Sequence, residues 1–236
     1  MPAASAAPIY PPAPRDPSVA DVYHGRTVAD PYRALEDPDA QVTRDFCVAQ
    51  NEVTRSFLDR ARPFRDRVQR EIELIYNYDK YDTPCKKGRW FYYTHHRGLE
   101  NQAVIMQSST VDVDDAAENG ARVFLDPNAL AEDGTASIGK SEWSNDGTFV
   151  AYGVQRSGSD WADIHIMNTD TRNVLPETLE WAKFYSIAWT HDNKGFYYCR
   201  FPTPDSLRES DDKDKRGAET DEARNQAVYY HELNSP

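Results

Sequence analysis

Serine and histidine are the residue types in this sequence that could support nucleophilic catalysis. Serine hydrolases of the α/β type present their nucleophile on a Gly-X-Ser-X-Gly turn, and the sequence contains no such pattern. The nearest glycine–serine cluster is Ser157-Gly158-Ser159-Asp160. Because this cluster stands between two expected strands, we interpret it as a turn.

The histidines and paired carboxylates assemble no further site. His95 and His96 are adjacent, so in a strand their rings point to opposite faces and cannot bind one metal ion together. Glu36 and Asp37 precede a proline and are typical of a turn. Three other histidines fall in expected strands or turns, where we interpret them as packed or surface side chains: His165, His191 and His231. The sequence therefore predicts no catalytic residues, no metal ligands and no cofactor.

The cysteines and the acidic loop also argue against a metal or disulfide site. The three cysteines are far apart and match neither a disulfide framework nor a zinc spacing: Cys47, Cys85 and Cys199. The acidic residues 112–120 lack the ligand order of a calcium loop and are interpreted as a solvated loop. With no Asn-X-Ser/Thr acceptor and no signal peptide at residues 1–17, these features predict a reducing, cytoplasmic location.

Composition narrows the possible partners. The 236 residues carry a net charge of −12, which argues against nucleic acid or an anionic membrane surface as a partner. No segment approaches the roughly 18 consecutive apolar residues that a membrane span needs. Only 39% of residues are hydrophobic, so the core must depend on 14 Tyr, 9 Phe and 5 Trp, which suits many short strands.

Many of the aromatic residues stand in a hairpin pattern that occurs twice in the sequence. Residues 143–152 and 189–198 each read as a strand end, a polar turn on Asp and a second strand rich in aromatics. We expect the Asp side chain to bond the turn backbone and Gly to supply positive φ. A hairpin repeated at this interval is typical of the blades of a β-propeller.

Two amphipathic helices are expected before the strands begin. Apolar residues recur at helical spacing through residues 42–57 and again after Pro63, and Asp39 is the expected N-cap of the first helix. Two helices cannot close a core alone, so they must dock on something larger. In the later part of the chain, residues 202–224 form a charged insertion. Its residues 210–216 are too polar to pack, and we interpret them as a mobile surface loop.

The strands add up to three repeating units. Asn101-Gln102-Ala103-Val104 returns as Asn225-Gln226-Ala227-Val228, which makes residues 227–233 the matching strand of the third unit. Propellers have about four to eight blades, and three would leave open sheet edges. We therefore predict a mainly β chain with a helical amino-terminal segment, forming about three blades of a larger β-propeller.

Motifs distributed along the sequence closely resemble the amino-terminal third of members of the prolyl oligopeptidase family. Members of this family are cytosolic, proline-specific serine endopeptidases. The resemblance covers roughly residues 10–233. It is carried by Asp21-Val22-Tyr23-His24-Gly25, Asp30-Pro31-Tyr32, Leu35-Glu36-Asp37, Gln50-Asn51, Val123-Phe124-Leu125-Asp126-Pro127-Asn128, Tyr152-Gly153, Ser157-Gly158-Ser159-Asp160-Trp161 and Ala188-Trp189-Thr190-His191-Asp192. One departure is Ala34, where the family usually has tryptophan.

The resemblance implies a division of the chain and an activity. Residues 1–76 are expected to be the arm and helices that pack on an α/β-hydrolase domain, and residues 77–236 the first three blades of a seven-bladed propeller that gates access to the active site. The Ser–Asp–His triad of the family is expected beyond Pro236, so this chain alone is predicted to be inactive. The complete enzyme would cleave short proline-containing peptides, with the rest of the hydrolase domain and propeller as partners.

One substrate-binding residue is implied by the resemblance. The family places a phenylalanine in the substrate cleft just before the Ala-Trp-Thr-His-Asp motif, and Phe184 stands at that position. The alternative is a core aromatic at the start of a strand. Two other functions stay open, a non-catalytic binding module and part of a related peptide cyclase.

Overall fold

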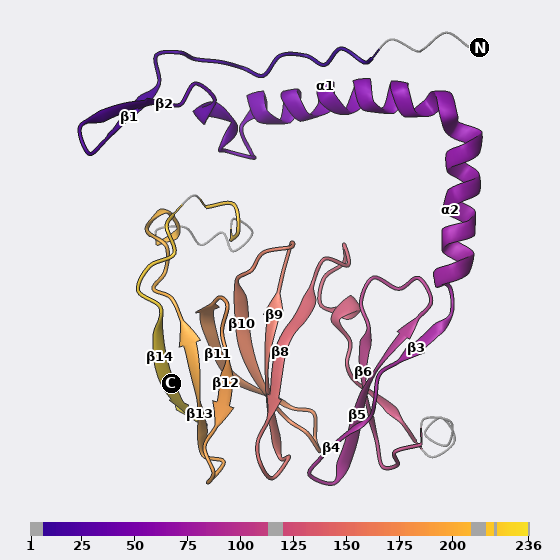
Figure 1. The fold of residues 1–236 in the computed structure, drawn as a ribbon. Coiled ribbons are helices and arrows are strands. Elements are labelled where there is room, and N and C mark those ends of the chain that lie inside the picture. Colours follow the sequence, from indigo (N-terminus) through magenta and orange to yellow (C-terminus); the bar gives the residue numbers. More distant parts are fainter. Residues whose placement is uncertain (1–6, 113–119, 209–215, 220, 236) are drawn as a thin grey trace. The chain divides into compact units, whose positions relative to one another are not determined.

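The computed structural model describes residues 7–112, 120–208, 216–219 and 221–235. The chain divides into two units, Met1–Leu74 and Ile75–Pro236, which are described separately (Figure 1). The expected acidic loop lies almost entirely outside the described residues, as does the middle of the charged insertion, residues 209–215.

The first unit begins with an extended arm and continues into helices. A two-stranded antiparallel hairpin follows the extended residues. Arg33 connects this hairpin to the next turn through ion pairs with Asp21 and Asp30. The unit contains β1 (Ala20–Tyr23), β2 (Arg26–Ala29), η1 (Arg33–Leu35), α1 (Gln41–Leu58), η2 (Asp59–Ala61) and α2 (Arg62–Tyr76), the last of which ends two residues into the second unit. Ala34, the departure from the family pattern, is exposed in this chain.

The predicted N-cap of α1 is wrong. The capping position is Ala40, whose side chain can accept no hydrogen bond, and the helix begins at Gln41. Asp39 instead pairs with Arg44 at 3.3 Å, while its backbone N–H donates to Asp37 Oδ1 at 2.9 Å. A turn stabilised by Asp37 therefore precedes the helix and holds Asp39 out of the capping position.

Neither helix has buried its apolar face. Both helices lie within the described residues, and neither contains a buried residue. Ile72 and Ile75, on the apolar side of α2, are 50% and 67% exposed. This agrees with the expectation that two such helices cannot close a core by themselves.

The described part of the second unit folds into three antiparallel sheets, shown side by side in Figure 1. The first sheet contains β3 (Asp79–Tyr81), β4 (Cys85–Lys87), β5 (Trp90–Arg97), β6 (Val104–Ser108) and β7 (Arg122–Leu125). The second has β8 (Ser137–Trp143), β9 (Phe149–Gln155), β10 (Ala162–Asn168) and β11 (Val174–Ala182), and the third has β12 (Ile187–Trp189), β13 (Gly195–Arg200) and β14 (Ala227–Glu232). Short 3-10 turns lie at η3 (Pro127–Ala129) and η4 (Asp205–Leu207).

The two hairpin copies form β8–β9 and β12–β13, as expected. In each turn a hydroxyl donates to the Asp, from Ser144 to Asp146 and from Thr190 to Asp192, both at 2.7 Å. Glycine supplies positive φ only in the first turn. Gly147 has φ +75°, whereas Asn193 takes this place in the second turn with φ +58°, because asparagine tolerates the left-handed region.

Alternation along β9 buries the second sheet on both faces. Val150 and Tyr152 pack in one cluster with Phe124 of the first sheet, and the intervening Ala151 packs in another with Phe196 of the third. Because successive strand residues point to opposite faces, the second sheet is the centre of the core.

Candidate functional site

Phe184 lies in the connection between β11 and β12, where the chain passes from the second sheet to the third. Its side chain is 74% exposed, while the next residue, Tyr185, is buried. The core alternative for Phe184 is therefore wrong in this chain. Its φ of +49° is uncommon for a bulky side chain, and such backbone conformations concentrate at functional sites.

Tyr185 fixes the position of this connection. Burial raises the pKa of its phenol, which accepts a hydrogen bond from the Lys140 backbone N–H at 3.2 Å. A Cβ added at Gly153 would lie 1.8 Å from this phenol oxygen. The absence of a side chain at Gly153 thus leaves room for the buried phenol of Tyr185, the residue next to Phe184.

A cation and two aromatic rings lie beside the exposed phenylalanine. The Lys183 ammonium group is 4.8 Å from the Trp161 ring centroid and 5.6 Å from that of Phe184. Both distances are within cation–π range. Trp161 is buried and meets Trp181 and Phe201 edge to face, so one partner of Lys183 belongs to the rigid core and the other is exposed.

Part of the charged insertion packs against this cluster. Arg216 is 11% exposed in its side chain and contacts Asp163 at 2.6 Å and Glu180 at 3.3 Å. Its guanidinium also lies 4.2 Å from the Trp181 ring centroid. Glu219 accepts a hydrogen bond from the Trp161 indole N–H. The expectation that residues 210–216 are too polar to pack is thus wrong for Arg216, because its partners on β10 and β11 carry the complementary charge. Residues 210–215 lie outside the described residues.

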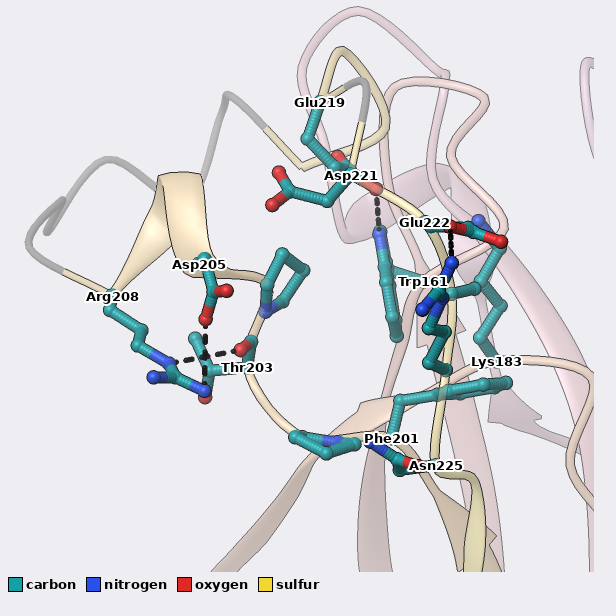
Figure 2. Close-up of a pocket in the computed structure, with 14 residues that line it drawn as sticks. Trp161, Lys183, Phe201, Thr203, Asp205, Arg208, Glu219, Asp221, Glu222 and Asn225 are labelled. Atoms are coloured by element: carbon teal, nitrogen blue, oxygen red, sulfur yellow. Dashed lines mark hydrogen bonds and ion pairs between the residues drawn. The ribbon is translucent and has the colours of Figure 1, made fainter. Parts of the chain in front are cut away.

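A cavity of about 200 Å³ opens beside Trp161 and Lys183. Figure 2 shows it bounded by Phe201 and by charged residues of the insertion. Several of these charges pair with near neighbours, including Arg208 with Asp205 at 3.0 Å and Arg224 with Glu222. The side chain of Ser206 donates to Asp221, which lowers the pKa of that carboxyl. The cavity therefore has an aromatic side, formed by Trp161 and Phe201, and a side formed by charged residues of the insertion.

The glycine–serine cluster lies next to this site, because Ser157 and Ser159 line a pocket with Trp161 and Arg216. Ser157 and Gly158 have φ of +52° and +71°, and the Ser159 N–H donates to Arg156 O at 2.9 Å. The interpretation of this cluster as a turn is confirmed. His95 stacks on Tyr81 with 4.4 Å between ring centroids, and buried His231 lies 3.7 Å from Glu177. These histidines therefore contact protein groups.

The described residues form neither a candidate metal site nor a membrane-spanning helix. They hold no group of three or more His, Cys, Asp or Glu side chains placed to share a metal ion. None of their helices is both long and apolar enough to cross a membrane.

Sequence reasoning missed Lys183, Trp161 and Arg216 as members of one site. Lys183 was adjacent to the expected contact residue, and its spacing from Trp161 gives no local signal. Arg216 is 53 residues from Asp163, and it stood in a run of charges that reads as solvated. The one available hint was the presence of Trp161 and Trp181, because tryptophan rings are the preferred partners of cations.

Comparison with known proteins gives the family of this chain. The profile of the family described as "Prolyl oligopeptidase, N-terminal beta-propeller domain" matches residues 11–236. Among curated relatives, a prolyl endopeptidase of Elizabethkingia meningoseptica is 37% identical over 78% of this chain and 25% of its own length. Prolyl oligopeptidase A of Galerina marginata is 34% identical over 96% of this chain and 32% of its own. A dual function macrocyclase-peptidase of Amanita bisporigera is 32% identical over 87% and 30%, respectively.

Solved structures show the same relationship. Prolyl oligopeptidase B of Galerina marginata, bound to a 35mer hydrolysis and macrocyclization substrate, matches with a TM-score of 0.76 and 30% identity over 97% of this chain and 33% of that one. A prolyl endopeptidase studied for inter-domain dynamics gives 0.74 and 29% over 96% and 31%. The chain thus spans a quarter to a third of the relatives it matches. Since the profile covers nearly all of the sequence and the fold agrees, the chain belongs to the prolyl oligopeptidase family and corresponds to its N-terminal propeller portion.

Proposed function

We propose that this chain is the substrate-gating part of a serine-type endopeptidase that cleaves short peptides after proline. The proposal is supported by the family and by relatives named as prolyl endopeptidases. The three sheets of the second unit would be the first three blades of a seven-bladed propeller. The arm and helices of residues 1–76 would pack on the hydrolase domain, and the exposed apolar face of α2 supports a partner of that kind.

Phe184 is the residue we propose to contact the peptide. The observation that carries this assignment is its 74% exposure at a backbone position with positive φ. Contact with a ligand would bury this exposed apolar ring, and the uncommon backbone conformation is of a kind that concentrates at functional sites. A prolyl peptide, with apolar rings and few donors, is a suitable partner for this surface.

Peptide binding to the purified chain tests this assignment. A fluorescently labelled proline-containing peptide should bind the Phe184→Ala variant at least about fivefold more weakly than the wild type, the effect of losing one aromatic anchor. Leu99→Ala is the matched control, because Leu99 is an exposed apolar residue in a turn of the first sheet. Equal affinity of Phe184→Ala and wild type would remove Phe184 from the site.

We also propose that the chain alone has no peptidase activity. Neither the sequence nor the site described above contains a nucleophile, a general base and an oxyanion donor in reach of one another. The chain should release no chromophore from a proline-containing chromogenic peptide, and a fluorophosphonate serine probe should not label it. Turnover or labelling would contradict the proposal.

A cytoplasmic location is supported by the absence of disulfides among the cysteines, which are free.

A second candidate is part of a peptide macrocyclase, favoured by the likeness to the macrocyclase-peptidase and to a structure with a macrocyclization substrate. The two candidates differ in the length of peptide that the propeller must admit. A cyclase part should bind a peptide of about 35 residues more tightly than a short peptide with the same proline segment, as expected for a larger contact. A hydrolase part should bind both alike. A non-catalytic module would bind no proline-containing peptide, yet would be monodisperse and melt cooperatively.

A further inference from the structure

Two bulky residues have positive φ near Phe184, one at the end of β11 and one in the connection that follows it. Trp181 has φ +65° and Phe184 has φ +49°. Side chains of this size leave the left-handed region unless their surroundings hold them there. The contacts of this connection therefore decide where the exposed ring of Phe184 lies.

Trp181 is held on several sides. Its carbonyl accepts a hydrogen bond from the Phe201 N–H at 3.0 Å, and its ring contacts both Trp161 and the Arg216 guanidinium. Arg216 is in turn paired with Asp163. These contacts join the end of β11 to Phe201, which follows β13, and to Arg216 of the insertion. The start of the connection is therefore fixed.

Phe184 has fewer contacts. The Lys183 carbonyl accepts a hydrogen bond from the Gln226 side chain at 3.0 Å, which fixes the backbone just before it. The ring itself has one ring or cation contact in the described structure, with the Lys183 ammonium group. Because that group also lies over buried Trp161, Lys183 links an exposed ring to an immobile one.

We propose that Lys183 is a positioning residue, whose ammonium group over Trp161 holds the Phe184 ring in place for contact with a peptide. This inference rests on the proposed contact between Phe184 and the substrate and adds the residue that prepares it. Residues 216–219 support the arrangement through Glu219, which bonds the Trp161 indole. The expected benefit is preorganisation, since a ring already held in place loses less freedom when peptide binds.

Lys86 provides a matched control. Its ammonium group lies 5.6 Å from the Phe91 centroid in the first sheet, the same distance that separates Lys183 from Phe184. Lys183→Met removes the charge and keeps the apolar stem, Lys183→Arg keeps a cation in reach of both rings, and Lys86→Met removes an equivalent contact outside the site.

Nuclear magnetic resonance tests the positioning contact without any ligand. Lysines of the chain are dimethylated with ¹³C-formaldehyde, which preserves their charge, and the Lys183 signal is the one missing from Lys183→Arg. Ring currents should move this signal from the free-lysine position, and Phe184→Ala should reduce the displacement while leaving the Lys86 signal unchanged. A Lys183 signal that does not respond to Phe184→Ala would overturn the inference.

Peptide affinity then tests the consequence. Lys183→Met should weaken binding of the labelled proline-containing peptide about three- to tenfold, the scale of one partly desolvated cation–π contact, while its melting temperature stays within about 4 °C of wild type. Lys183→Arg should restore affinity to within about twofold, and Lys86→Met should match wild type. If Phe184→Ala weakens binding but Lys183→Met does not, the positioning role is wrong and the Phe184 contact stands. If Phe184→Ala has no effect, the proposed contact itself is wrong.

Discussion

The two copies of the hairpin, residues 143–152 and 189–198, share their length and the hydroxyl-to-Asp hydrogen bond of the turn but have different surroundings. Ala151 and Tyr197 occupy the same place in the repeat, yet Ala151 is fully buried and Tyr197 is 51% exposed. The first copy lies in the second sheet, which packs against a neighbour on each face. The second copy lies in the third sheet, which packs against the second. The repeat thus determines the hairpin, and its neighbours determine which residue fits each position.

The candidate site lies at the boundary between these two differently packed sheets. Phe184 lies in the connection between the sheets that carry the two copies, at the boundary between a sheet packed on both faces and one packed on a single described face. The buried side supplies Trp161 as a fixed support. The exposed side leaves room for Phe184 to reach a ligand.

The largest expected difference between the two copies is in the stability cost of exchanging the equivalent residues Ala151 and Tyr197. Ala151→Tyr inserts a phenol where the exposure is 0%, so it should lower the free energy of unfolding by about 3 kcal/mol or abolish folding. Tyr197→Ala should cost no more than about 1 kcal/mol, because half of the ring is in solvent. Urea denaturation followed by tryptophan fluorescence measures both. Equal costs would show that the second sheet is not packed on both faces.

The turns should respond by smaller amounts. Gly147 has φ +75° and an added Cβ would lie 2.5 Å from Gly88 N, so Gly147→Ala should cost about 2 kcal/mol. Asn193→Gly keeps the positive φ and loses the hydrogen bond from the Asn145 N–H, 2.8 Å long, so it should cost about 1 kcal/mol.

Thermal unfolding of the two turn variants checks this order. A larger loss for Asn193→Gly would mean that the hydrogen bond between the turns matters more than the close approach of Gly88 and Gly147. In that case the contact between the second and third sheets would contribute more to stability than the packing between the first and second.

The sequence predicted the local elements well because their signals are local. The strand at residues 122–125 and the two hairpins have the alternation and turn residues that define them. Asp39 was mistaken for the cap because the neighbouring carboxylate of Asp37 competes for the same backbone region. The position of Phe184 came from the family resemblance, but its exposure could come only from the packing of Tyr185 beside it.

The contacts that build the candidate site could not be predicted from spacing. Arg216 pairs with Asp163 and Glu219 bonds Trp161 across 53 and 58 residues. Arg216 and Glu219 lie in the insertion between β13 and β14, whereas Trp161 and Asp163 lie at the start of β10, so no periodicity within one element indicates these pairs. Such pairs depend on how the connection and the insertion meet in space, which the turn and strand signals leave open.

The most direct test of the proposed role is the location of peptide binding on the chain itself. Backbone amide signals of the ¹⁵N-labelled protein are followed while an unlabelled proline-containing peptide is added. The account predicts the largest shifts at Lys183, Phe184 and Trp161, and their loss in Phe184→Ala. Shifts confined to the first sheet, or no shifts at saturating peptide, would contradict the assignment of Phe184 as the peptide contact.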